Sequence, residues 1–466
     1  MTTLWPRIAA YARDHPGRAA VVGEHGATYR ELVDLAEATA ARGCAGCGPG
    51  DVVGISAATS LGGLAAMLAV LSRGAAFLPL DIGSPAARQD YMLRNAGARL
   101  VIRQTAPGRL EPEPLAGGPP VPARTAYVMY TSGSTGLPKG VLVSEPALAG
   151  RLAGLARVPG FAAGSSFLAL TALSFDICLA ELLLPLLHGG QVVLAPPAAR
   201  LDPAVFADVV ARHAPDVIQA TPSFWRLALA AGWTGATRSV LWCGGEPLTG
   251  QLARELSPLG RELWNLYGPT EATIWSNAWL VDPARPVSLG AALPGSTCHL
   301  VGEDGGIITE PGREGEIALG GTGLALGYVG DPPEQARFTS RPGHYLTGDR
   351  GRYRQDRSLE FLGRRDTQVK YRGHRIELGE VESALEAHTG VHQAVVFCCE
   401  PDDPARTHLA AVVAAPGAIT ARELRTWLAG RLPPMMLPKR ITIRPSLPRT
   451  STGKVDRVAL RADQSR

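Results

Sequence analysis

The sequence predicts an α/β protein with a large N-terminal layered α/β region that includes a β-subdomain, followed by a small mobile C-terminal α+β domain. Three observations lead to this prediction. The chain has 466 residues, which is too long for one compact core. Through residues 1–285, helical patterns alternate with short apolar runs, as is typical of parallel strands joined by helices. From residue 286 the pattern changes to short strands separated by glycine.

The N-terminal elements follow from this alternation. Residues 29–42 carry a helical pattern, and the apolar runs at residues 52–56 and 100–102 predict strands. Residues 103–126 are rich in proline and glycine, which favours a surface loop. Further strands are predicted at residues 126–130, 167–170, 191–194 and 216–220, with helical stretches between them.

The C-terminal part of the chain has two patterns. Residues 286–364 contain strands punctuated by glycine, such as Gly315-Glu-Ile-Ala-Leu-Gly320, and predict the β-subdomain. Beyond residue 367, helical patterns at 380–389 and 421–432 alternate with strands at 393–399 and 409–414. Because about 100 residues suffice for a separate domain, we expect a core of residues 1–365 and a C-terminal domain of residues 366–466.

The composition excludes several classes of protein. Apolar residues make up 45% of the chain and charged residues 19%, which indicates a globular protein. The net charge of +4 gives no electrostatic reason to expect nucleic acid or a membrane as a partner. Residues 167–187 are apolar but include Asp176, Glu181 and Pro185, which favours a buried core segment. The N-terminus lacks a signal-peptide pattern, so we expect a cytoplasmic protein.

Two patterns imitate cofactor sites. The seven cysteines form no disulfide framework, and Cys44-Ala-Gly-Cys47 has redox or zinc spacing without a second pair. Gly321-Thr-Gly323-Leu-Ala-Leu-Gly327 imitates a dinucleotide-binding fingerprint, but its last spacing is one residue too long. We therefore expect no redox, zinc or dinucleotide site at these positions.

The strongest local signal is the run Tyr130-Thr-Ser-Gly-Ser-Thr-Gly-Leu-Pro-Lys139-Gly140, which follows a predicted strand. Glycine lets backbone N–H groups approach phosphate oxygens, and lysine neutralises their charge. Lysine is rare in this chain, since only four of its 46 basic residues are lysine. Pro138 stands where a Walker A loop would have its second glycine. The run therefore predicts a phosphate-binding loop that is not of the kinase or GTPase type.

Further motifs follow one another along nearly the whole chain. They are Thr28-Tyr-Arg-Glu-Leu32, Leu71-Ser-Arg-Gly-Ala-Ala-Phe-Leu-Pro-Leu-Asp81, Ser174-Phe-Asp176, Asn265-Leu-Tyr-Gly-Pro-Thr-Glu271, Gly315-Glu-Ile, Tyr345-Leu-Thr-Gly-Asp349, Gly363-Arg-Arg-Asp-Thr-Gln-Val-Lys370-Tyr-Arg-Gly-His-Arg-Ile-Glu-Leu-Gly-Glu380, Leu432-Pro-Pro-Met-Met-Leu-Pro438 and Thr452-Gly-Lys454-Val-Asp-Arg457. In this order, and with the phosphate loop, they resemble the adenylate-forming enzymes, and among these the adenylation domains of nonribosomal peptide synthesis. The resemblance implies an enzyme that activates a carboxylate with ATP and releases pyrophosphate.

The resemblance also implies roles for individual residues. Lys454 is the expected catalytic residue, which would bridge the substrate carboxylate and the phosphate or ribose oxygens. Glu271 is the expected ligand of Mg²⁺, because that ion prefers hard oxygen donors. Asp349 would accept both ribose hydroxyls, and Tyr267 would stack on adenine. The residues expected to bind ATP or AMP are Thr131, Ser132, Gly133, Ser134, Thr135, Gly136, Lys139, Gly244, Asn265, Tyr267, Gly268, Thr270, Asp349 and Arg364.

Asp176 indicates the class of acid. It lies in the apolar run Leu173-Ser-Phe-Asp-Ile-Cys-Leu-Ala180, where an unpaired carboxylate would cost several kcal/mol. No lysine or arginine stands near it in the sequence. In the resembled family, an aspartate at this position binds the α-ammonium of the substrate. The substrate is therefore expected to be an α-amino acid rather than a fatty or aryl acid.

The side-chain pocket is expected from its distance to the motifs. Its residues are Ile177, Ala180, Gln219, Leu241, Cys243, Leu266, Ile274 and Trp275. None is charged, and Trp275 with the branched residues leaves little volume. The set resembles the glycine-type pocket of the family, with departures at Ala180 and Cys243. We expect a small neutral amino acid, namely alanine or glycine, with serine as a further candidate.

The expected partner is a separate carrier protein with a phosphopantetheine arm, because the chain ends shortly after Lys454. The C-terminal domain is expected to swing about a hinge at Asp366, exchanging Lys454 for the segment around Lys370. A small accessory activator protein is a further candidate partner.

Two alternatives remain. A carboxylate–CoA ligase would form a CoA thioester of a non-amino acid, and Asp176 argues against it. A non-catalytic relative that acts as a binding partner should lack catalytic residues, yet Lys139, Glu271, Asp349 and Lys454 are all present.

Overall fold

The structure is a computed structural model that describes residues 3–106, 109–133, 137–366, 368–371, 374–400, 406–415, 417, 419–449 and 455–464. The chain divides into two compact units. The first contains residues up to Ile82, Leu93–Met129 and Gly140–Arg365. The second contains Gly83–Met92, Tyr130–Lys139 and the described residues from Asp366 onward. Because the second unit includes segments from both halves of the chain, a domain boundary at residues 365 and 366 stays a prediction.

The first large sheet lies in the first unit. Its strands are, in spatial order, β15 (Ala291–Ala292), β14 (Asn277–Leu280), β13 (Gly260–Tyr267), β12 (Ala236–Gly244), β11 (Val217–Ala220), β9 (Ser166–Ala169), β10 (Gln191–Leu194), β1 (Ala19–Val22) and β2 (Ala27–Thr28). The strands from β13 to β1 are parallel, and the strands at both edges are antiparallel. The central strand β11 is buried along its whole length, and β12 is buried from Ser239 to Gly244, because both faces of a parallel sheet are covered.

The second large sheet contains β19 (Gly327–Tyr328), β8 (Lys139–Ser144), β7 (Thr125–Thr131), β4 (Ala76–Leu80), β3 (Val52–Ser56), β5 (Leu100–Ala106) and β6 (Arg109–Pro114), in that order. The strand β6 corrects one prediction, since residues 103–126 were expected to form a loop. It pairs antiparallel with β5 at the edge of the sheet. Pro112 and Pro114 are tolerated there because an edge strand has one side without backbone partners.

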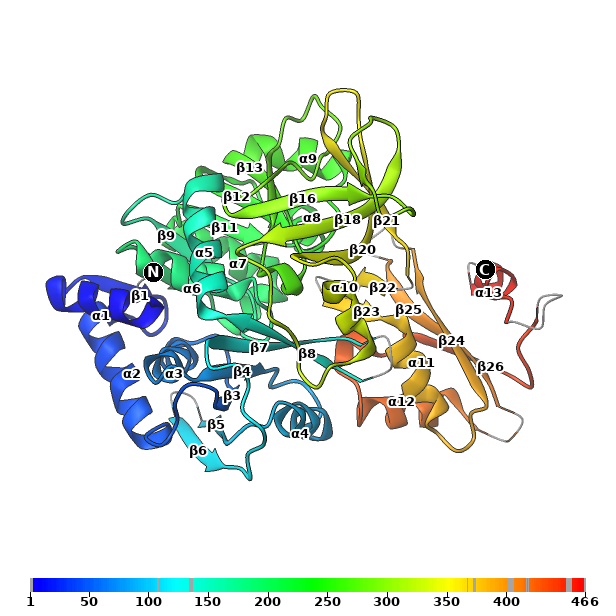
Figure 1. Cartoon of the computed structure of the whole chain (residues 1–466), viewed down its shortest axis with the longest axis horizontal. Helices are drawn as coiled ribbons and strands as arrows, with labels where there is room; N and C mark the ends of the chain where they lie inside the picture. The colour runs from blue at the N-terminus through cyan, green and yellow to red at the C-terminus, as the bar shows by residue number, and fades with distance from the viewer. Residues whose placement is uncertain are drawn as a thin grey trace. The chain divides into compact units, whose positions relative to one another are not determined.

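The helices of the first unit pack against the two large sheets and against one another. They are α1 (Leu4–Asp14), α2 (Tyr29–Gly43), α3 (Leu61–Ser72), α5 (Glu145–Leu155), α6 (Cys178–Leu187), α7 (Pro203–His213), α8 (Pro222–Ala230) and α9 (Gly250–Leu256). Short helices are η1 (Ala156–Gly160), η2 (Pro197–Arg200), η3 (Ser257–Leu259), η4 (Thr270–Ala272), η5 (Pro333–Gln335) and α10 (Ala336–Thr339). The helices α1, α2 and α3 pack together (Figure 1), and α2 begins at a capping box formed by Thr28 and Glu31.

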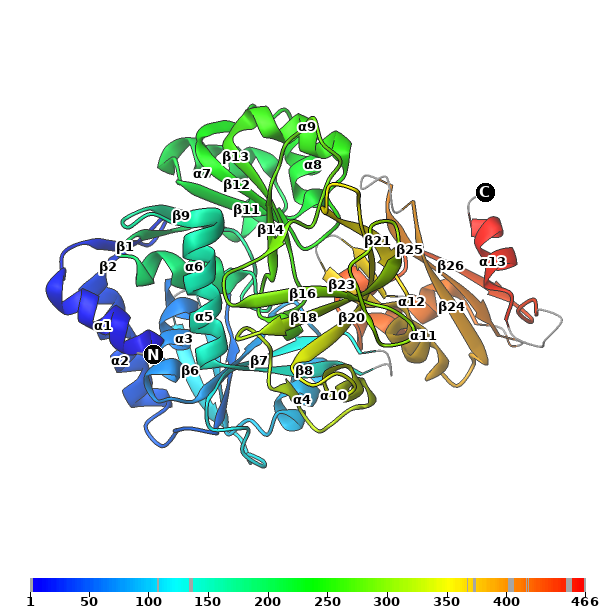
Figure 2. The ribbon, with the colours of Figure 1, turned by 45° about the horizontal axis from the view of Figure 1, so that its top comes forward.

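Two of the core clusters lie on opposite faces of the first sheet. One cluster contains α3, α5 and α6 together with side chains from both large sheets, so these helices lie between the sheets (Figure 2). The other cluster contains side chains of α7, α8 and α9, including Phe206, Trp225 and Leu252. The side on which a strand residue points therefore decides which core it joins.

A smaller antiparallel sheet follows in the first unit. It consists of β17 (Ile307–Ile308), β16 (Ser296–Val301), β18 (Glu314–Gly321), β20 (His344–Tyr353) and β21 (Leu359–Arg364). Its position in the chain confirms the β-subdomain that was predicted for residues 286–364.

The second unit is α+β. It includes β22 (Gln368–Tyr371), β23 (His374–Glu377), α11 (Leu378–Glu386), β24 (Gln393–Cys399), β25 (His408–Ala414), α12 (Ala421–Ala429), η6 (Pro434–Met436), β26 (Arg440–Arg444) and α13 (Arg457–Gln464), and it also takes in part of α4 (Ala86–Asn95). Its apolar core is formed by α11, α12 and the strands β24 and β25. The helices and strands predicted for this region are confirmed.

Among the helices that the structure describes, none is both long enough and apolar enough to cross a lipid bilayer.

Candidate active site

Asp176 lies in the turn between β9 and α6. Only 3% of the residue is exposed, and its Oδ2 accepts a hydrogen bond from the backbone N–H of Ile274 at 3.3 Å. Burial raises the pKa of the carboxyl to about 6, although hydrogen bonds from Thr270 and Ile274 oppose the rise. In the part of the chain that the structure describes, no lysine or arginine forms an ion pair with it. The carboxylate is thus placed to receive a cation from a ligand.

Glu271 lies in η4, a few residues after the end of β13. It is fully buried, and its Oε1 accepts a hydrogen bond from the Tyr328 hydroxyl at 2.7 Å. The same hydroxyl lies 3.3 Å from the hydroxyl of Tyr345. A carboxylate held by a phenol hydroxyl offers the hard oxygen donor that Mg²⁺ prefers, so this residue fits the expected metal.

Asp349 is the centre of a third polar group, on the antiparallel strands β20 and β21. Arg364 is its cross-strand neighbour and contacts Asp349 Oδ1 through Nη1 at 2.5 Å. The Tyr267 hydroxyl donates to Asp349 Oδ2 at 2.6 Å. Burial, helped by the negative charge of Asp349, raises the pKa of Tyr267 well above its ordinary value, so this hydroxyl stays protonated. Three of the expected nucleotide-binding residues are therefore brought together.

Three other expected nucleotide-binding residues lie in, or directly after, the strands β12 and β13. A methyl group on Gly244 would lie 2.6 Å from Trp275 Cη2, and one on Gly268 would lie 2.8 Å from Trp275 Cα. Asn265 is buried and donates through Nδ2 to the Ser288 carbonyl at 2.8 Å. Both glycines thus allow Trp275 to approach the ends of β12 and β13.

Five of the eight expected pocket residues belong to one large core cluster. Ile177, Ala180, Leu266, Ile274 and Trp275 are all buried in the same core cluster. A methyl group on Gly245 would lie 3.6 Å from Ile177 and 3.9 Å from Trp275, which shows that these two side chains converge.

The other expected pocket residues are divided by the sheet. Gln219 is buried opposite Trp242 in the pairing of β11 with β12, and its Oε1 accepts a hydrogen bond from the Thr171 hydroxyl at 3.3 Å. Leu241 and Cys243 flank Trp242 in β12 and pack into the other core, with Trp225 and Leu252. Successive side chains of a strand point to opposite faces, so the structure does not bring Leu241 and Cys243 together with Trp275.

The expected phosphate loop lies in the second unit. Thr131 ends β7 and Lys139 begins β8, and Lys139 is buried. The Ser132 hydroxyl donates to the Arg375 carbonyl at 2.7 Å and accepts from the backbone N–H of Glu377 at 3.1 Å. Next to Ser132, Gly133 is also described. Ser134, Thr135 and Gly136 lie outside the described residues, as does the expected catalytic residue Lys454.

Comparison with known proteins identifies the family. Residues 8–329 match the family described as AMP-binding enzyme, and residues 380–454 match the AMP-binding enzyme C-terminal domain. The chain belongs to the AMP-binding enzyme family. A dimodular nonribosomal peptide synthase of Bacillus subtilis is 36% identical to it over 454 residues, which cover 90% of this chain and 19% of the relative. Phosphinothricin tripeptide synthetase PhsC of Streptomyces viridochromogenes is 37% identical, with 98% and 45% covered. The chain therefore spans less than half the length of these relatives.

Solved structures show the same relationship. A four-domain nonribosomal peptide synthetase, holo-AB3403 bound to AMP and glycine, is 32% identical with a TM-score of 0.72, covering 98% of this chain and 36% of that one. PA1221, which contains adenylation and PCP domains, is 28% identical with a TM-score of 0.82, covering 98% of this chain and 84% of that one. These matches confirm the predicted fold and the resemblance to adenylation domains of nonribosomal peptide synthesis.

Two residues of this AMP-binding enzyme were missed by the sequence analysis. Tyr328 holds Glu271 from 57 positions away, and Arg151 contacts the loop after Glu271 from more than 120 positions away. Arg151 had one detectable signal, since it stands within an otherwise apolar helical segment beside Leu148, Leu152 and Leu155.

Proposed function

We propose that this chain catalyses the ATP-dependent adenylation of a small neutral α-amino acid, namely alanine, glycine or serine. Transfer to the phosphopantetheine thiol of a separate carrier protein follows. The observation that carries the proposal is Asp176, which is buried and has no ion-pair partner among the described residues. The α-ammonium of an amino acid supplies that partner, whereas a fatty or aryl acid would leave the carboxylate unpaired. The relative bound to AMP and glycine supports this class of substrate.

Each of the residues described above has a separate role in the proposed reaction. Asp176 binds the α-ammonium and so orients the α-carboxylate. Asp349 accepts hydrogen bonds from the ribose hydroxyls of ATP, and Arg364 fixes its position. One carboxylate oxygen then forms a bond to the α-phosphorus of ATP while the bond to pyrophosphate breaks. Glu271 would hold Mg²⁺, which would neutralise charge on the phosphate oxygens.

The uncharged character of the expected pocket residues supports the choice of substrate. Ile177, Ala180, Leu266, Ile274 and Trp275 are uncharged and buried together, which leaves no counter-charge for an acidic or basic side chain. One methyl group changes binding by only about 1–3 kcal/mol, so relaxed selection among glycine, alanine and serine is expected.

The catalytic role of Lys454 stays a prediction, because the residue lies outside the described part of the chain. Lys454→Ala should lower the rate of adenylate formation by far more than tenfold, about 1.4 kcal/mol in the barrier, while leaving the thermal unfolding temperature unchanged. A rate within tenfold of that of the unmodified chain would contradict this role.

The test of the proposed function is ATP–pyrophosphate exchange with each of the twenty amino acids and their D-forms. Exchange that is strongest with glycine, alanine or serine supports the proposal. A preference for phenylalanine or leucine by more than about tenfold would contradict the small pocket. Exchange with no amino acid, together with CoA thioester formation from another carboxylic acid, would identify a carboxylate–CoA ligase instead.

A further inference from the structure

The loop that follows Glu271 has an unusual backbone. Thr273 and Ile274 are consecutive residues with φ of 58° and 64°. Such values are rare outside glycine, and they are most unfavourable for β-branched residues such as these. The loop is nevertheless central to the site, because it carries Glu271, the N–H of Ile274 that meets Asp176, and Trp275. Some other part of the molecule must hold it in this conformation.

Arg151, in the helix α5, makes contacts that can hold this loop in its conformation. Its Nε donates to the Thr273 carbonyl at 2.9 Å, and its Nη2 donates to the Ala272 carbonyl at 3.0 Å. Its Nη1 donates to the Ser296 hydroxyl at 2.6 Å, which ties the guanidinium to the strand β16. Only 2% of the residue is exposed. Each nitrogen of the guanidinium thus has an acceptor, and two of the acceptors belong to the strained loop.

The position of Arg151 is not explained by an ion pair. No carboxylate among the described residues pairs with it, so its burial serves carbonyl and hydroxyl acceptors. Burial lowers its pKa to about 10, and the group therefore stays protonated at neutral pH. A buried arginine is costly unless its donors are used, and a lysine could not reach the same acceptors with one ammonium group.

Gly323 completes the arrangement from the other side. The Thr273 hydroxyl donates to the Gly323 carbonyl at 2.7 Å, and a methyl group on Gly323 would overlap Nη2 of Arg151. The glycine that imitated a dinucleotide fingerprint therefore has another purpose, which is to leave room for the guanidinium.

We propose that Arg151 is a positioning residue, which holds residues 270–275 in the strained conformation that presents the Ile274 N–H to Asp176 and Glu271 to the metal. The consequence for substrate binding rests on the proposed function. The effect on the conformation of residues 270–275 is independent of the proposed function, because it depends only on contacts within the first unit.

The first test is hydrogen–deuterium exchange of the backbone amides of residues 270–276. Arg151→Lys keeps the charge but not the three contacts, and Gly323→Ala displaces the guanidinium without changing Arg151. Both variants should exchange these amides at least tenfold faster than the unmodified chain. Unchanged exchange in folded Arg151→Lys would overturn the proposal, since the loop would then keep its conformation without the guanidinium.

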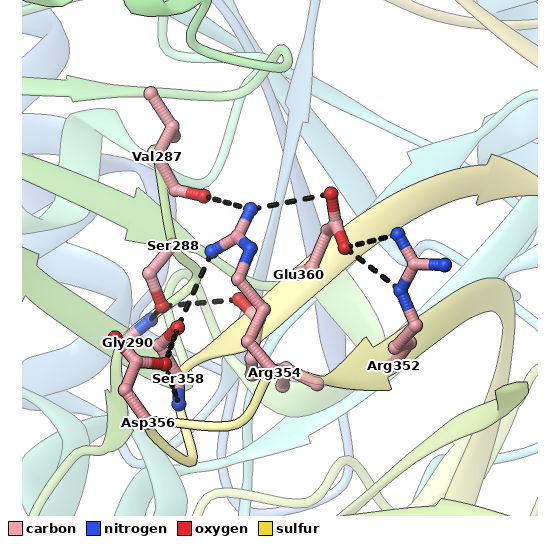
Figure 3. Close-up of polar contacts among 9 residues, drawn as sticks. Val287, Ser288, Gly290, Arg352, Arg354, Asp356, Ser358 and Glu360 are labelled. Atoms are coloured by element: carbon pink, nitrogen blue, oxygen red, sulfur yellow. Dashed lines mark hydrogen bonds and ion pairs between the residues drawn. The ribbon is translucent and has the colours of Figure 1, made fainter. Parts of the chain in front are cut away.

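Matched controls separate this effect from a general loss of stability. Figure 3 shows Arg354, a partly buried arginine that donates to the Val287 carbonyl at 2.9 Å and pairs with Glu360. Arg354→Lys removes a similar set of contacts elsewhere in the first unit. Gly17→Ala is the control for Gly323→Ala, because a methyl group on Gly17 has no atom within 4 Å. Neither control should change the exchange of residues 270–276.

The second test uses steady-state adenylation by the full chain. Arg151→Lys should raise the KM for the amino acid at least tenfold, while the KM for ATP changes less than threefold. A lowered unfolding temperature with both KM values unchanged would show a structural residue only, and would overturn the proposal. If the unmodified chain activates no amino acid, the proposed function fails, but the exchange of residues 270–276 still decides the role of Arg151.

Discussion

Asp176 and Asp349 are both buried carboxylates of the first unit, but their surroundings differ. Asp349 has the Arg364 guanidinium at 2.5 Å and the Tyr267 hydroxyl at 2.6 Å. Asp176 has a backbone N–H at 3.3 Å, and no described residue forms an ion pair with it. Asp349 is therefore stabilised by partners within the protein, whereas under the proposed function Asp176 receives its counter-charge from the substrate. We call these two places the nucleotide end and the amino-acid end. A buried charge without an ion-pair partner lowers stability, as is common where function requires such a group.

The strongest loss of activity is expected when the amino-acid end is altered. Asp176→Asn keeps the size of the side chain but removes the charge that would pair with an α-ammonium. Loss of one partner of a buried ion pair costs about 3–5 kcal/mol, so amino-acid-dependent pyrophosphate exchange should fall by about 10²- to 10⁴-fold. The affinity for ATP, measured by calorimetry, should change little. Exchange within tenfold of the unmodified chain would contradict the assignment of Asp176 as the receptor of the ammonium group.

The same variant should be more stable than the unmodified chain at high pH. The pKa of Asp176 is raised from its ordinary 3.8 to about 6 by burial, so the folded protein holds this proton to higher pH than the unfolded chain. The stability that this group contributes is present below about pH 4 and is lost as the pH rises to 6. At pH 8 the buried charge costs up to about 3 kcal/mol, which Asp176→Asn removes.

Urea unfolding at pH 4 and pH 8 measures this difference. The free energy of unfolding of Asp176→Asn should exceed that of the unmodified chain by about 1–3 kcal/mol at pH 8 and by little at pH 4. Equal stability at pH 8 would mean that the carboxylate already has a compensating partner.

A smaller effect is expected at the nucleotide end. Asp349→Asn removes the charge that faces Arg364 and the acceptor of the Tyr267 hydroxyl. Hydrogen bonds to charged groups contribute about 1.5–3 kcal/mol, so the KM for ATP should rise about 10- to 100-fold while the KM for the amino acid stays within threefold. Asp356→Asn is the control, because Asp356 is exposed and pairs with Arg285. A selective change in the KM for the amino acid would reverse the assignment of the two ends.

The smallest effect concerns which residues line the pocket for the amino-acid side chain. Ala180 lies in the cluster with Trp275, and Cys243 packs on the other face of the sheet. Ala180→Leu should raise the ratio of kcat/KM for glycine over that for alanine by about tenfold. Overpacking costs about 1–3 kcal/mol where a side chain must fit, so alanine loses more than glycine. Cys243→Ala should leave this ratio within twofold and lower stability by about 1 kcal/mol. A larger change of the ratio in Cys243→Ala would show that this residue lines the pocket.

Much of the fold could be predicted from local patterns. The helix at residues 29–42 and the strands at 52–56, 191–194 and 393–399 are found as α2, β3, β10 and β24. Hydrophobic periodicity and capping act within a few residues, so they are readable along the chain. The strand β6 was missed because proline-rich segments also form edge strands, and only pairing with β5 shows this.

The chemical character of the site could be predicted from the sequence through its resemblance to the adenylate-forming enzymes. Asp176 in an apolar run, Glu271 and Asp349 in their motifs, and the order of those motifs together indicate an adenylating enzyme. Each of these signals concerns a residue type and its immediate neighbours in the chain. None of them requires knowledge of distant contacts.

The way in which those residues are used depends on contacts between segments that are far apart in the chain. In a parallel sheet both faces are buried and apolar, so alternation along β12 cannot tell which core receives Leu241 and Cys243. Likewise, Arg151 meets the Thr273 carbonyl across 122 positions of sequence, and Gly323 approaches from 50 positions further on. Such contacts depend on how helices and strands pack, because the side chains that satisfy a buried group are chosen by proximity in space.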